Sequence, residues 1–326
     1  MSRRNPSCVT VLLPLFQLSL LQASFSSHCR PPNTTMESDF SPANGAPKDV
    51  PLKDAPLLLY DIAFAPPYAE NACAPNPWKA RYALNFKGAP YTTHWVQMHE
   101  IGKVRRGLGV PAGRKFADGT EFYTLPMLAG PGIPTPIGDS FDIAAYLETT
   151  FPGAGAGDLF PQQELPYTCP IKMEVLVPLS ERPKGPHDAY ERFNTEVDAA
   201  FSLHAQLMGQ GMVWDPKYEA DIKAEFVRRI GAESWEAMGI YGEPRRKMLD
   251  SLRDTVKELA EMFQKDTSGT FVLGERPSHA DIIVGGWLRM MSRTLPSEEW
   301  VEVEGWHDGV FGRLHAALQQ RFGDVQ

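Results

Sequence analysis

The segment Leu125-Pro126-Met127-Leu128 and the segment Ile137-Gly138-Asp139-Ser140-Phe141-Asp142 decide the fold of this chain. Thr124–Leu128 has the length and the apolar character of a β-strand, but it contains a proline, which a central strand does not tolerate. A cis Leu125–Pro126 bond resolves this conflict, because it bends the chain and leaves the Leu125 backbone N–H and C=O free for a ligand. The alternative is an edge strand in which Pro126 has no such role.

Asp139 and Ser140 lie at the predicted start of a helix. The Gly- and Pro-rich run 130–136 turns the chain, and Thr135–Ile137 is expected to pair back as a short strand. Apolar residues then recur at helical spacing from Ile143 onward. A helix start has unpaired N–H groups and the positive end of the helix dipole, so it favours a carboxylate ligand. The alternative is that Ser140 only caps the helix.

The residues before these segments alternate between strand and helix patterns. Leu57–Ile62 is a continuous apolar run of strand length, which indicates a central strand buried on both faces. Pro77–Gly88 begins with proline and ends with glycine, as many helices do. Tyr91–Val96 is rich in residues that favour strands, and Met98–Tyr123 is expected to be a long connection. The predicted order is strand, helix, strand and connection, before the paired strands and the helix described above.

This order resembles the glutathione-binding half of the glutathione transferase superfamily. The resemblance implies an α/β thioredoxin-like N-terminal domain, with the order β-α-β-α-β-β-α, over residues 56–152. It also implies an all-α C-terminal domain over residues 158–326, which would supply a pocket for a hydrophobic substrate. Glutathione is then the co-substrate, no metal is required, and a homodimer is expected.

The same resemblance assigns roles to individual residues. In the superfamily, the residue before the cis-proline holds the cysteinyl backbone of glutathione, and an acidic residue followed by serine holds its γ-glutamyl end. The first role falls on Leu125, beside Pro126. The second falls on Asp139 and Ser140.

The loop and helix start at residues 73–88 lie where a thioredoxin-like fold places its reactive group. The dipole at a helix start lowers the pKa of a thiol; in glutathione transferases that thiol belongs to glutathione. Pro75-Asn76-Pro77-Trp78-Lys79-Ala80-Arg81 resembles the etherase-type class, which includes bacterial lignin β-aryl-ether-cleaving enzymes and related fungal transferases. The resemblance implies transfer of glutathione to a hydrophobic electrophile, or cleavage of an aryl ether with glutathione.

The catalytic serine of that class falls on Ala74, which offers no hydrogen bond to a thiolate. Asn76 can donate an N–H instead, together with the backbone amides of the helix start. Losing one such donor costs on the order of a hundredfold in rate, so glutathione binding is better supported than glutathione activation. Two other functions stay open: a thiol oxidoreductase that uses Cys73 and glutathione, and a ligand-binding protein without catalysis. An inert, partly buried Cys73 is the simpler interpretation.

The residues after the first domain have helical patterns, with candidate helices at 188–208, 217–230, 244–264 and 310–322. Ser278 and Asp281 have the spacing of an N-cap and its third helical residue, with Asp in place of the usual Glu. This pair resembles the buried capping box that opens a core helix in glutathione transferases, where its role is folding.

Composition narrows the function classes. The chain has 326 residues, with 32 Lys and Arg against 40 Asp and Glu, for a net charge of −8. No basic block stands out, which argues against general nucleic-acid binding. The four cysteines show no metal-binding spacing and are too few for a disulfide framework, so they indicate a reducing compartment.

Residues 1–55 are predicted to be a flexible N-terminal extension. Arg3 and Arg4 precede the apolar run Val9–Leu21, an arrangement that resembles a secretory signal peptide. The first acidic residue is Glu37, which also fits a mitochondrial transit peptide, and Met36 as the true start is a third alternative. The apolar run is too short and too interrupted for a membrane span. We expect the body of the chain to be cytoplasmic.

Overall fold

The computed structural model describes residues 55–116, 118–172 and 185–326. The predicted extension over residues 1–55 therefore lies outside the described residues, apart from Ala55.

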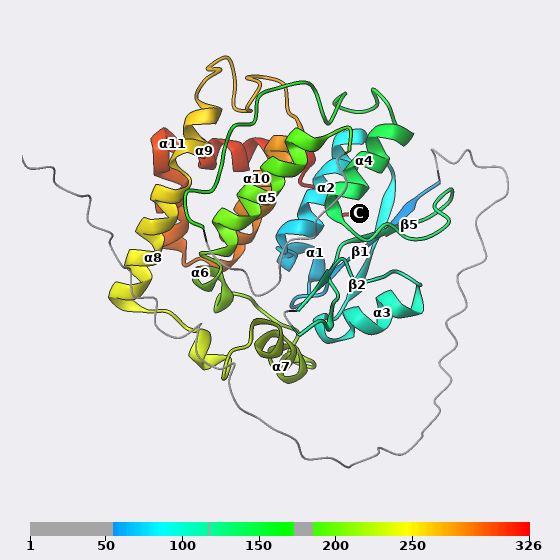
Figure 1. Cartoon of the computed structure of the whole chain (residues 1–326), viewed down its shortest axis with the longest axis vertical. Coiled ribbons are helices and arrows are strands. Elements are labelled where there is room, and N and C mark those ends of the chain that lie inside the picture. Colours follow the sequence, from blue (N-terminus) through cyan, green and yellow to red (C-terminus); the bar gives the residue numbers. More distant parts are fainter. Residues whose placement is uncertain (1–54, 117, 173–184) are drawn as a thin grey trace, which may run out of the picture. The chain divides into compact units, whose positions relative to one another are not determined.

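A mixed three-stranded sheet forms the centre of the N-terminal region (Figure 1). Its strands are β1 (Leu57–Ile62), β2 (Tyr91–Val96) and β5 (Met127–Ala129), in the spatial order β2-β1-β5. β1 pairs parallel with β2 along its whole length and antiparallel with β5. Parallel neighbours need a crossover connection, and α2 (Pro75–Lys87) supplies it.

The side chains of β1 alternate between two apolar clusters, one on each face of the sheet. Leu57 and Leu59 belong to the larger cluster, together with residues of α2 and of α4 (Ser140–Thr150). Tyr60 belongs to a second cluster, together with Ile101 of α3 (Ile101–Gly107). The strand is therefore buried on both faces, as its continuous apolar run predicts.

Residues 98–123 contain short elements where the sequence pattern predicts only a connection. They are η1 (Met98–Glu100), α3, and a hairpin of β3 (Arg114–Lys115) and β4 (Glu121–Phe122). A further short helix, α1 (Tyr68–Asn71), lies in the loop after β1. Such elements are too short to give a clear apolar period in the sequence. α3 is nonetheless the helix that the predicted order β-α-β-α-β-β-α requires between its second and third strands.

The strand predicted at Thr124–Leu128 begins later than expected. β5 starts at Met127, directly after Pro126, which has no N–H to donate to a strand ladder. The predicted partner strand, Thr135–Ile137, is reduced to a single bridge between Leu128 and Ile137. In this bridge each residue donates its N–H to the carbonyl oxygen of the other, at 2.8 Å. The bridge still brings the residues after Pro126 next to the residues before α4.

The remaining described residues are mainly helical. Their elements are α5 (Asp188–Ser202), α6 (Gln206–Gly209), α7 (Glu219–Ile230), η2 (Glu236–Met238), α8 (Gly242–Thr255), α9 (Lys257–Phe263), α10 (His279–Thr294) and α11 (Ser297–Phe322). Two predicted helices are each divided: 188–208 forms α5 and α6, and 244–264 forms α8 and α9, which meet at Val256. α11 leaves helical geometry over Trp306–Gly309.

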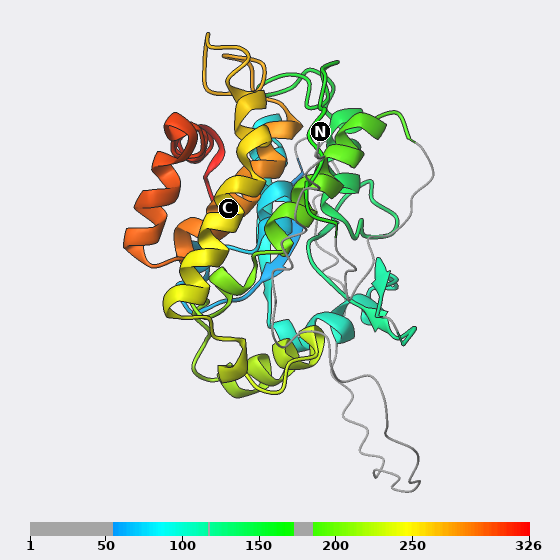
Figure 2. The same cartoon turned by 60° about the vertical axis from the view of Figure 1, so that its left-hand side comes forward.

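α10 is the central helix of this region, and it packs against α2, α5 and α11 (Figures 1 and 2). It begins with the predicted capping box, in which the Ser278 backbone N–H donates to Asp281 Oδ2 at 2.7 Å. The Ser278 hydroxyl donates to the same oxygen at 2.9 Å, and the Val272 N–H donates to Asp281 Oδ1 at 2.9 Å. These bonds satisfy a carboxylate that is fully buried, so Ser278 and Asp281 fix where α10 starts.

α7 and the residues around it return to the N-terminal region and cover the face of the sheet that carries the second cluster. Trp214 stacks on Phe64, which follows β1, with ring centroids 4.9 Å apart. Phe226 and Trp235 pack edge to face, 5.5 Å apart, in the same group of rings. In Figures 1 and 2, α7 accordingly lies next to α3. The sheet is thus covered by helices of the C-terminal region as well as by its own.

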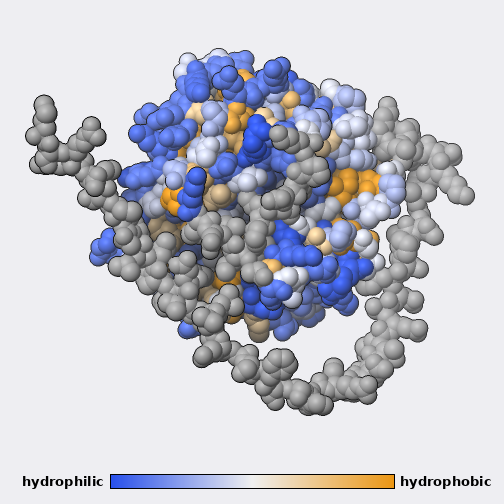
Figure 3. Space-filling view, in the orientation of Figure 1, coloured by the Kyte–Doolittle hydropathy of each residue, from blue (hydrophilic) through white to orange (hydrophobic). Residues whose placement is uncertain are grey.

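The face of the molecule drawn in Figure 3 is mainly hydrophilic, with apolar side chains in small separate areas. Among the described residues, the large apolar side chains that are exposed are Ile171, Val213, Tyr241 and Val301. None of the described helices combines the length and the apolar character needed to span a bilayer.

Candidate glutathione site

The start of α2 offers few hydrogen-bond donors. Ala74 is the N-cap residue and makes no side-chain cap, while Pro75 and Pro77 have no N–H. The Trp78 N–H is already used, because it donates to the Ala74 carbonyl oxygen at 3.1 Å. Of the backbone N–H groups at the start of α2, those of Ala74 and Asn76 therefore remain without a backbone partner among the described residues.

Asn76 is the one polar side chain in this first turn. It is half-buried, and its amide has no hydrogen-bond partner among the described residues. The loop before it is held in place, since Trp78 Nε1 donates to the Ala72 carbonyl oxygen at 2.7 Å. Asn76 therefore presents both a backbone N–H and a side-chain amide at the positive end of the helix.

The Leu125–Pro126 peptide bond is cis. Leu125 is buried and belongs to the same apolar cluster as Cys73 and Ala74, which precede the first residue of α2. Its backbone N–H and C=O have no partner among the described residues, as the sequence predicts. A buried amide without a partner is costly unless a ligand or water satisfies it.

Asp139 and Ser140 lie at the start of α4. Asp139, rather than Ser140, is the N-cap residue, and its Oδ1 accepts hydrogen bonds from the Phe141 N–H at 2.8 Å and the Asp142 N–H at 3.4 Å. Ser140 is the first helical residue, is 5 % exposed, and its hydroxyl has no partner among the described residues. Ser140 is therefore not the N-cap residue of α4, and the alternative that made it the cap is wrong.

Lys79 lies one turn after Asn76 and connects α2 to the helical region. Its Nζ donates to Asp198 Oδ1 at 2.5 Å and to Asn194 Oδ1 at 2.9 Å, both on α5. Trp287 Nε1 of α10 donates to the same Asp198 oxygen at 2.7 Å. Burial lowers the pKa of Lys79, and the Asp198 carboxylate opposes that shift. α4 packs directly against α2.

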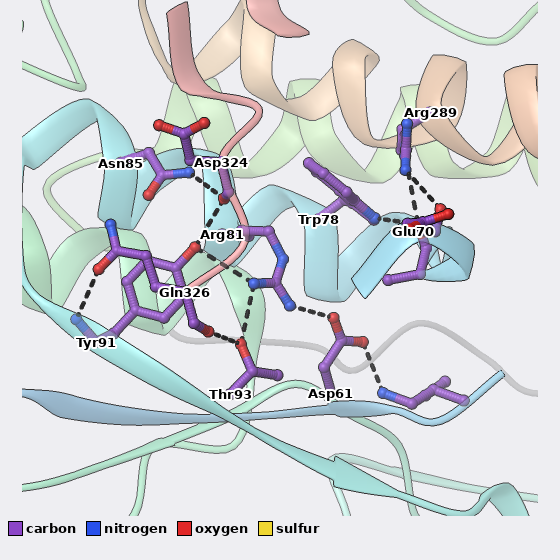
Figure 4. Close-up of polar contacts among 12 residues, drawn as sticks. Asp61, Glu70, Trp78, Arg81, Asn85, Tyr91, Thr93, Arg289, Asp324 and Gln326 are labelled. Atoms are coloured by element: carbon purple, nitrogen blue, oxygen red, sulfur yellow. Dashed lines mark hydrogen bonds and ion pairs between the residues drawn. The ribbon is translucent and has the colours of Figure 1, made fainter. Parts of the chain in front are cut away.

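Arg81 lies on the side of α2 that faces the sheet, and Figure 4 shows its contacts. Its Nη2 donates to Asp61 Oδ2 of β1 at 2.7 Å, and its Nη1 donates to Thr93 Oγ1 of β2 at 3.0 Å and to Tyr91 Oη at 3.3 Å. The Arg81 and Asp61 side chains are both fully buried. Burial raises the pKa of Asp61, and the Arg81 guanidinium opposes that shift. The pair fixes α2, and so Asn76, against the sheet.

The last described residues also contact α2 and β2 (Figure 4). Asn85 Nδ2 donates to the carbonyl oxygens of Phe322 at 2.7 Å and Asp324 at 2.8 Å. Thr93 Oγ1 donates to the carbonyl oxygen of Gln326 at 2.6 Å. The segment after α11 therefore lies along the N-terminal region and completes the surroundings of Arg81.

Cys73 is buried, with 2 % of its surface exposed. Burial raises the pKa of its thiol to about 12, although Arg289 opposes that shift. At neutral pH the thiol is therefore protonated and shielded from solvent. These surroundings are those of a structural cysteine rather than a reactive one.

Lys79, Arg81 and Arg105 received no role from the sequence. The only available signal was the presence of charged residues within apolar stretches, as with Lys79 and Arg81 beside Trp78 and Tyr82. The contacts of the segment after α11 could not be predicted from the sequence, because they end on backbone carbonyl oxygens, which every residue type has. Among the described residues, no group of three or more His, Cys, Asp or Glu side chains is arranged to hold a metal ion.

Comparison with known proteins gives consistent results. The family profile "Glutathione S-transferase, N-terminal domain" matches residues 74–150, and "Glutathione S-transferase, C-terminal domain" matches residues 223–321. The glutathione S-transferase-like protein ustS of Aspergillus flavus is 26 % identical over 291 residues, which cover 82 % of this chain and 91 % of that protein.

Solved structures agree with these matches. A glutathione S-transferase of Ceriporiopsis subvermispora, crystallised in complex with glutathione, is 27 % identical with a TM-score of 0.65, over 83 % of this chain and 98 % of that one. A glutathione transferase from Phanerochaete chrysosporium, at 22 % identity, has the same fold, with a TM-score of 0.65 over 83 % of this chain and 98 % of that one. The two matched profiles together cover more than half of this chain, which confirms the predicted fold class, and the chain belongs to the glutathione S-transferase family.

Proposed function

We propose that this protein binds glutathione between the start of α2, the Leu125–Pro126 segment and the start of α4. One observation carries the proposal: Asn76, Leu125 and Ser140 each have polar groups without a partner among the described residues. A tripeptide can satisfy all of them, with its cysteinyl backbone on Leu125 and its γ-glutamyl end on Asp139 and Ser140. The positive end of the α4 dipole favours the α-carboxylate of that γ-glutamyl group.

The proposed reaction is transfer of glutathione to a hydrophobic electrophile. Asn76 and the positive end of α2 stabilise the thiolate of glutathione, whose proton passes to solvent. The sulfur then forms a bond to an electrophilic carbon, and the leaving group departs with the electron pair of the bond that breaks. With an aryl ether the leaving group is a phenolate, as the resemblance to the etherase-type class implies.

A ligand-binding protein without catalysis is the second candidate, and Ala74 is the observation that favours it. A side-chain hydroxyl at this N-cap position would add a donor, and the flanking prolines remove two others. The third candidate, a thiol oxidoreductase that uses Cys73, is disfavoured by the burial and the raised pKa of that thiol.

Ultraviolet titration of the thiolate of bound glutathione tests the proposal. Transferase chemistry predicts a thiol pKa well below that of a free thiol, about 8.5. If glutathione binds with an unchanged pKa, the protein is a binder rather than a transferase. If glutathione does not bind at all, the assignment of the site is wrong.

A further inference from the structure

Arg105 lies where both halves of the proposed glutathione site begin. It is on α3 and is 2 % exposed. Its Nη1 donates to the carbonyl oxygens of Thr124 at 2.6 Å and Gly138 at 3.0 Å, and its Nη2 donates to the Pro111 carbonyl oxygen at 2.6 Å. Thr124 directly precedes Leu125, and Gly138 directly precedes Asp139. One nitrogen atom therefore joins the two chain segments that would hold the two ends of the ligand.

Gly138 leaves room for the Arg105 guanidinium because it has no side chain. A Cβ at residue 138 would lie 2.3 Å from Arg105 Nη2 and 2.8 Å from Val110 Cγ1, closer than real Cβ atoms approach. Any other residue would force the guanidinium away from the segment before Asp139. Arg105 and Gly138 therefore form a matched pair, in which the missing side chain of one makes room for the other.

The chemistry of Arg105 suits a geometric role. All three of these hydrogen bonds end on backbone carbonyl oxygens, so they fix main-chain positions rather than side chains. Burial lowers the pKa of Arg105, and the nearby Asp139 carboxylate opposes that shift. A guanidinium presents its donors in a rigid planar fork, whereas a lysine ammonium cannot reproduce that pattern.

We propose that Arg105 is a positioning residue that fixes the separation between the Leu125 backbone and the Asp139–Ser140 helix start. The inference rests on the proposed function. A ligand that spans two half-sites gains affinity over its fragments only when their separation matches its own length. Arg105 thereby sets how much affinity glutathione gains by placing its γ-glutamyl and cysteinyl parts on the protein at the same time.

The test compares glutathione with cysteinylglycine, which lacks the γ-glutamyl group and contacts only the Leu125 half. Affinities are measured by calorimetry for glutathione and by ligand-observed NMR for the weaker dipeptide. Arg105→Lys is expected to weaken glutathione binding by at least about tenfold and to leave cysteinylglycine binding unchanged. Gly138→Ala is expected to give the same pattern, because it displaces the guanidinium without replacing Arg105.

Two substitutions on the same helix serve as matched controls. Arg106 is exposed, and a Cβ on Gly107 would meet nothing within 4 Å. Arg106→Lys and Gly107→Ala are expected to bind both ligands as the unmodified protein does. Circular dichroism and thermal melting check the fold of each variant, and Gly138→Ala decides the question if Arg105→Lys does not fold.

The outcomes separate this inference from the proposed function. If the unmodified protein fails to bind glutathione, both are overturned. If it binds glutathione, but the variants lose both ligands to the same extent or neither ligand, Arg105 has no positioning role and the proposed function stands. Selective loss of glutathione supports both.

Discussion

Lys79 of α2 and Asp198 of α5 form a buried ion pair, with their side chains 1 % and 8 % exposed and 2.5 Å between Nζ and Oδ1. The pair joins the thioredoxin-like region to the helical region, and Lys79 lies one helical turn after Asn76. Trp287 Nε1 and Asn194 Nδ2 complete the hydrogen bonding of the carboxylate. One of the residues that connect the two regions is therefore on the same helix as the proposed thiolate donor.

Removing one member of this pair is expected to destabilise the protein strongly. Lys79→Met leaves a buried carboxylate without its cation, and such changes cost about 3–5 kcal/mol. The free energy of unfolding, measured by urea denaturation, is expected to fall by that amount. Lys247→Met, in the exposed Lys247–Glu243 pair, is the control and should cost about 1 kcal/mol or less. Equal losses in the two variants would contradict the structural role given to Lys79.

Asn76→Ala is expected to slow glutathione transfer by about tenfold to a hundredfold, because it removes a donor to the thiolate. Binding of glutathione should change much less, since Leu125, Asp139 and Ser140 remain. The pH–rate profile should shift to higher pH as the pKa of the bound thiol rises. Ala74→Ser is the complementary variant and should move the profile the other way. A profile that neither substitution moves would assign thiolate stabilisation to other groups.

Cys73→Ser is expected to retain glutathione transfer, because the buried Cys73 thiol, with its pKa raised to about 12, is protonated at neutral pH. In the folded protein, iodoacetamide should leave Cys73 and the buried Cys169 unmodified, as peptide mass spectrometry can show for each cysteine. Both should react after unfolding in urea. Rapid labelling of native Cys73, with loss of thiol-transfer activity in the serine variant, would favour the oxidoreductase instead.

Acid is expected to unfold the protein partly through His279. Burial lowers the pKa of this histidine from its usual 6.5 to about 3, and it packs against Phe141 and Phe160. Below pH 6.5 the unfolded chain therefore binds more protons at this histidine than the folded protein does. The free energy of unfolding is unaffected by His279 above the unfolded pKa and falls as the pH drops below it. The loss is about 1.4 kcal/mol per pH unit between those values.

Urea denaturation at several pH values measures this slope. His279→Phe keeps an aromatic ring but cannot take up a proton, so its stability should depend less on pH. His94→Gln, at an exposed position, should keep the slope of the unmodified protein. Parallel curves for the two variants would show that another group controls acid unfolding.

Much of the fold follows from local patterns in the sequence. Leu57–Ile62 predicts its strand to the residue, because an apolar run buried on both faces has sharp limits. The cis Leu125–Pro126 bond follows from a proline in a strand pattern, and the α10 start follows from the Ser278–Asp281 spacing. These features depend on residues that are neighbours in the chain.

What could not be predicted depends on contacts between distant residues. α3 has only a few residues and no repeated apolar period, so its pattern gives no signal. Arg105 reaches carbonyl oxygens 19 and 33 residues away, and backbone acceptors are the same for every residue type. The return of α7 to the sheet depends on rings at Phe64 and Trp214, whose pairing a single sequence does not reveal.

The contacts of the segment after α11 can form only late during synthesis of the chain. Asn85 and Thr93 leave the ribosome 237 and 233 residues before the Phe322 and Gln326 carbonyl groups that they bind. The buried Arg81 and Asp61 lie beneath them and are translated long before the residues that cover them. A nascent chain that already contains every proposed glutathione-binding residue therefore still lacks some of the scaffold around α2 until residues 322–326 emerge.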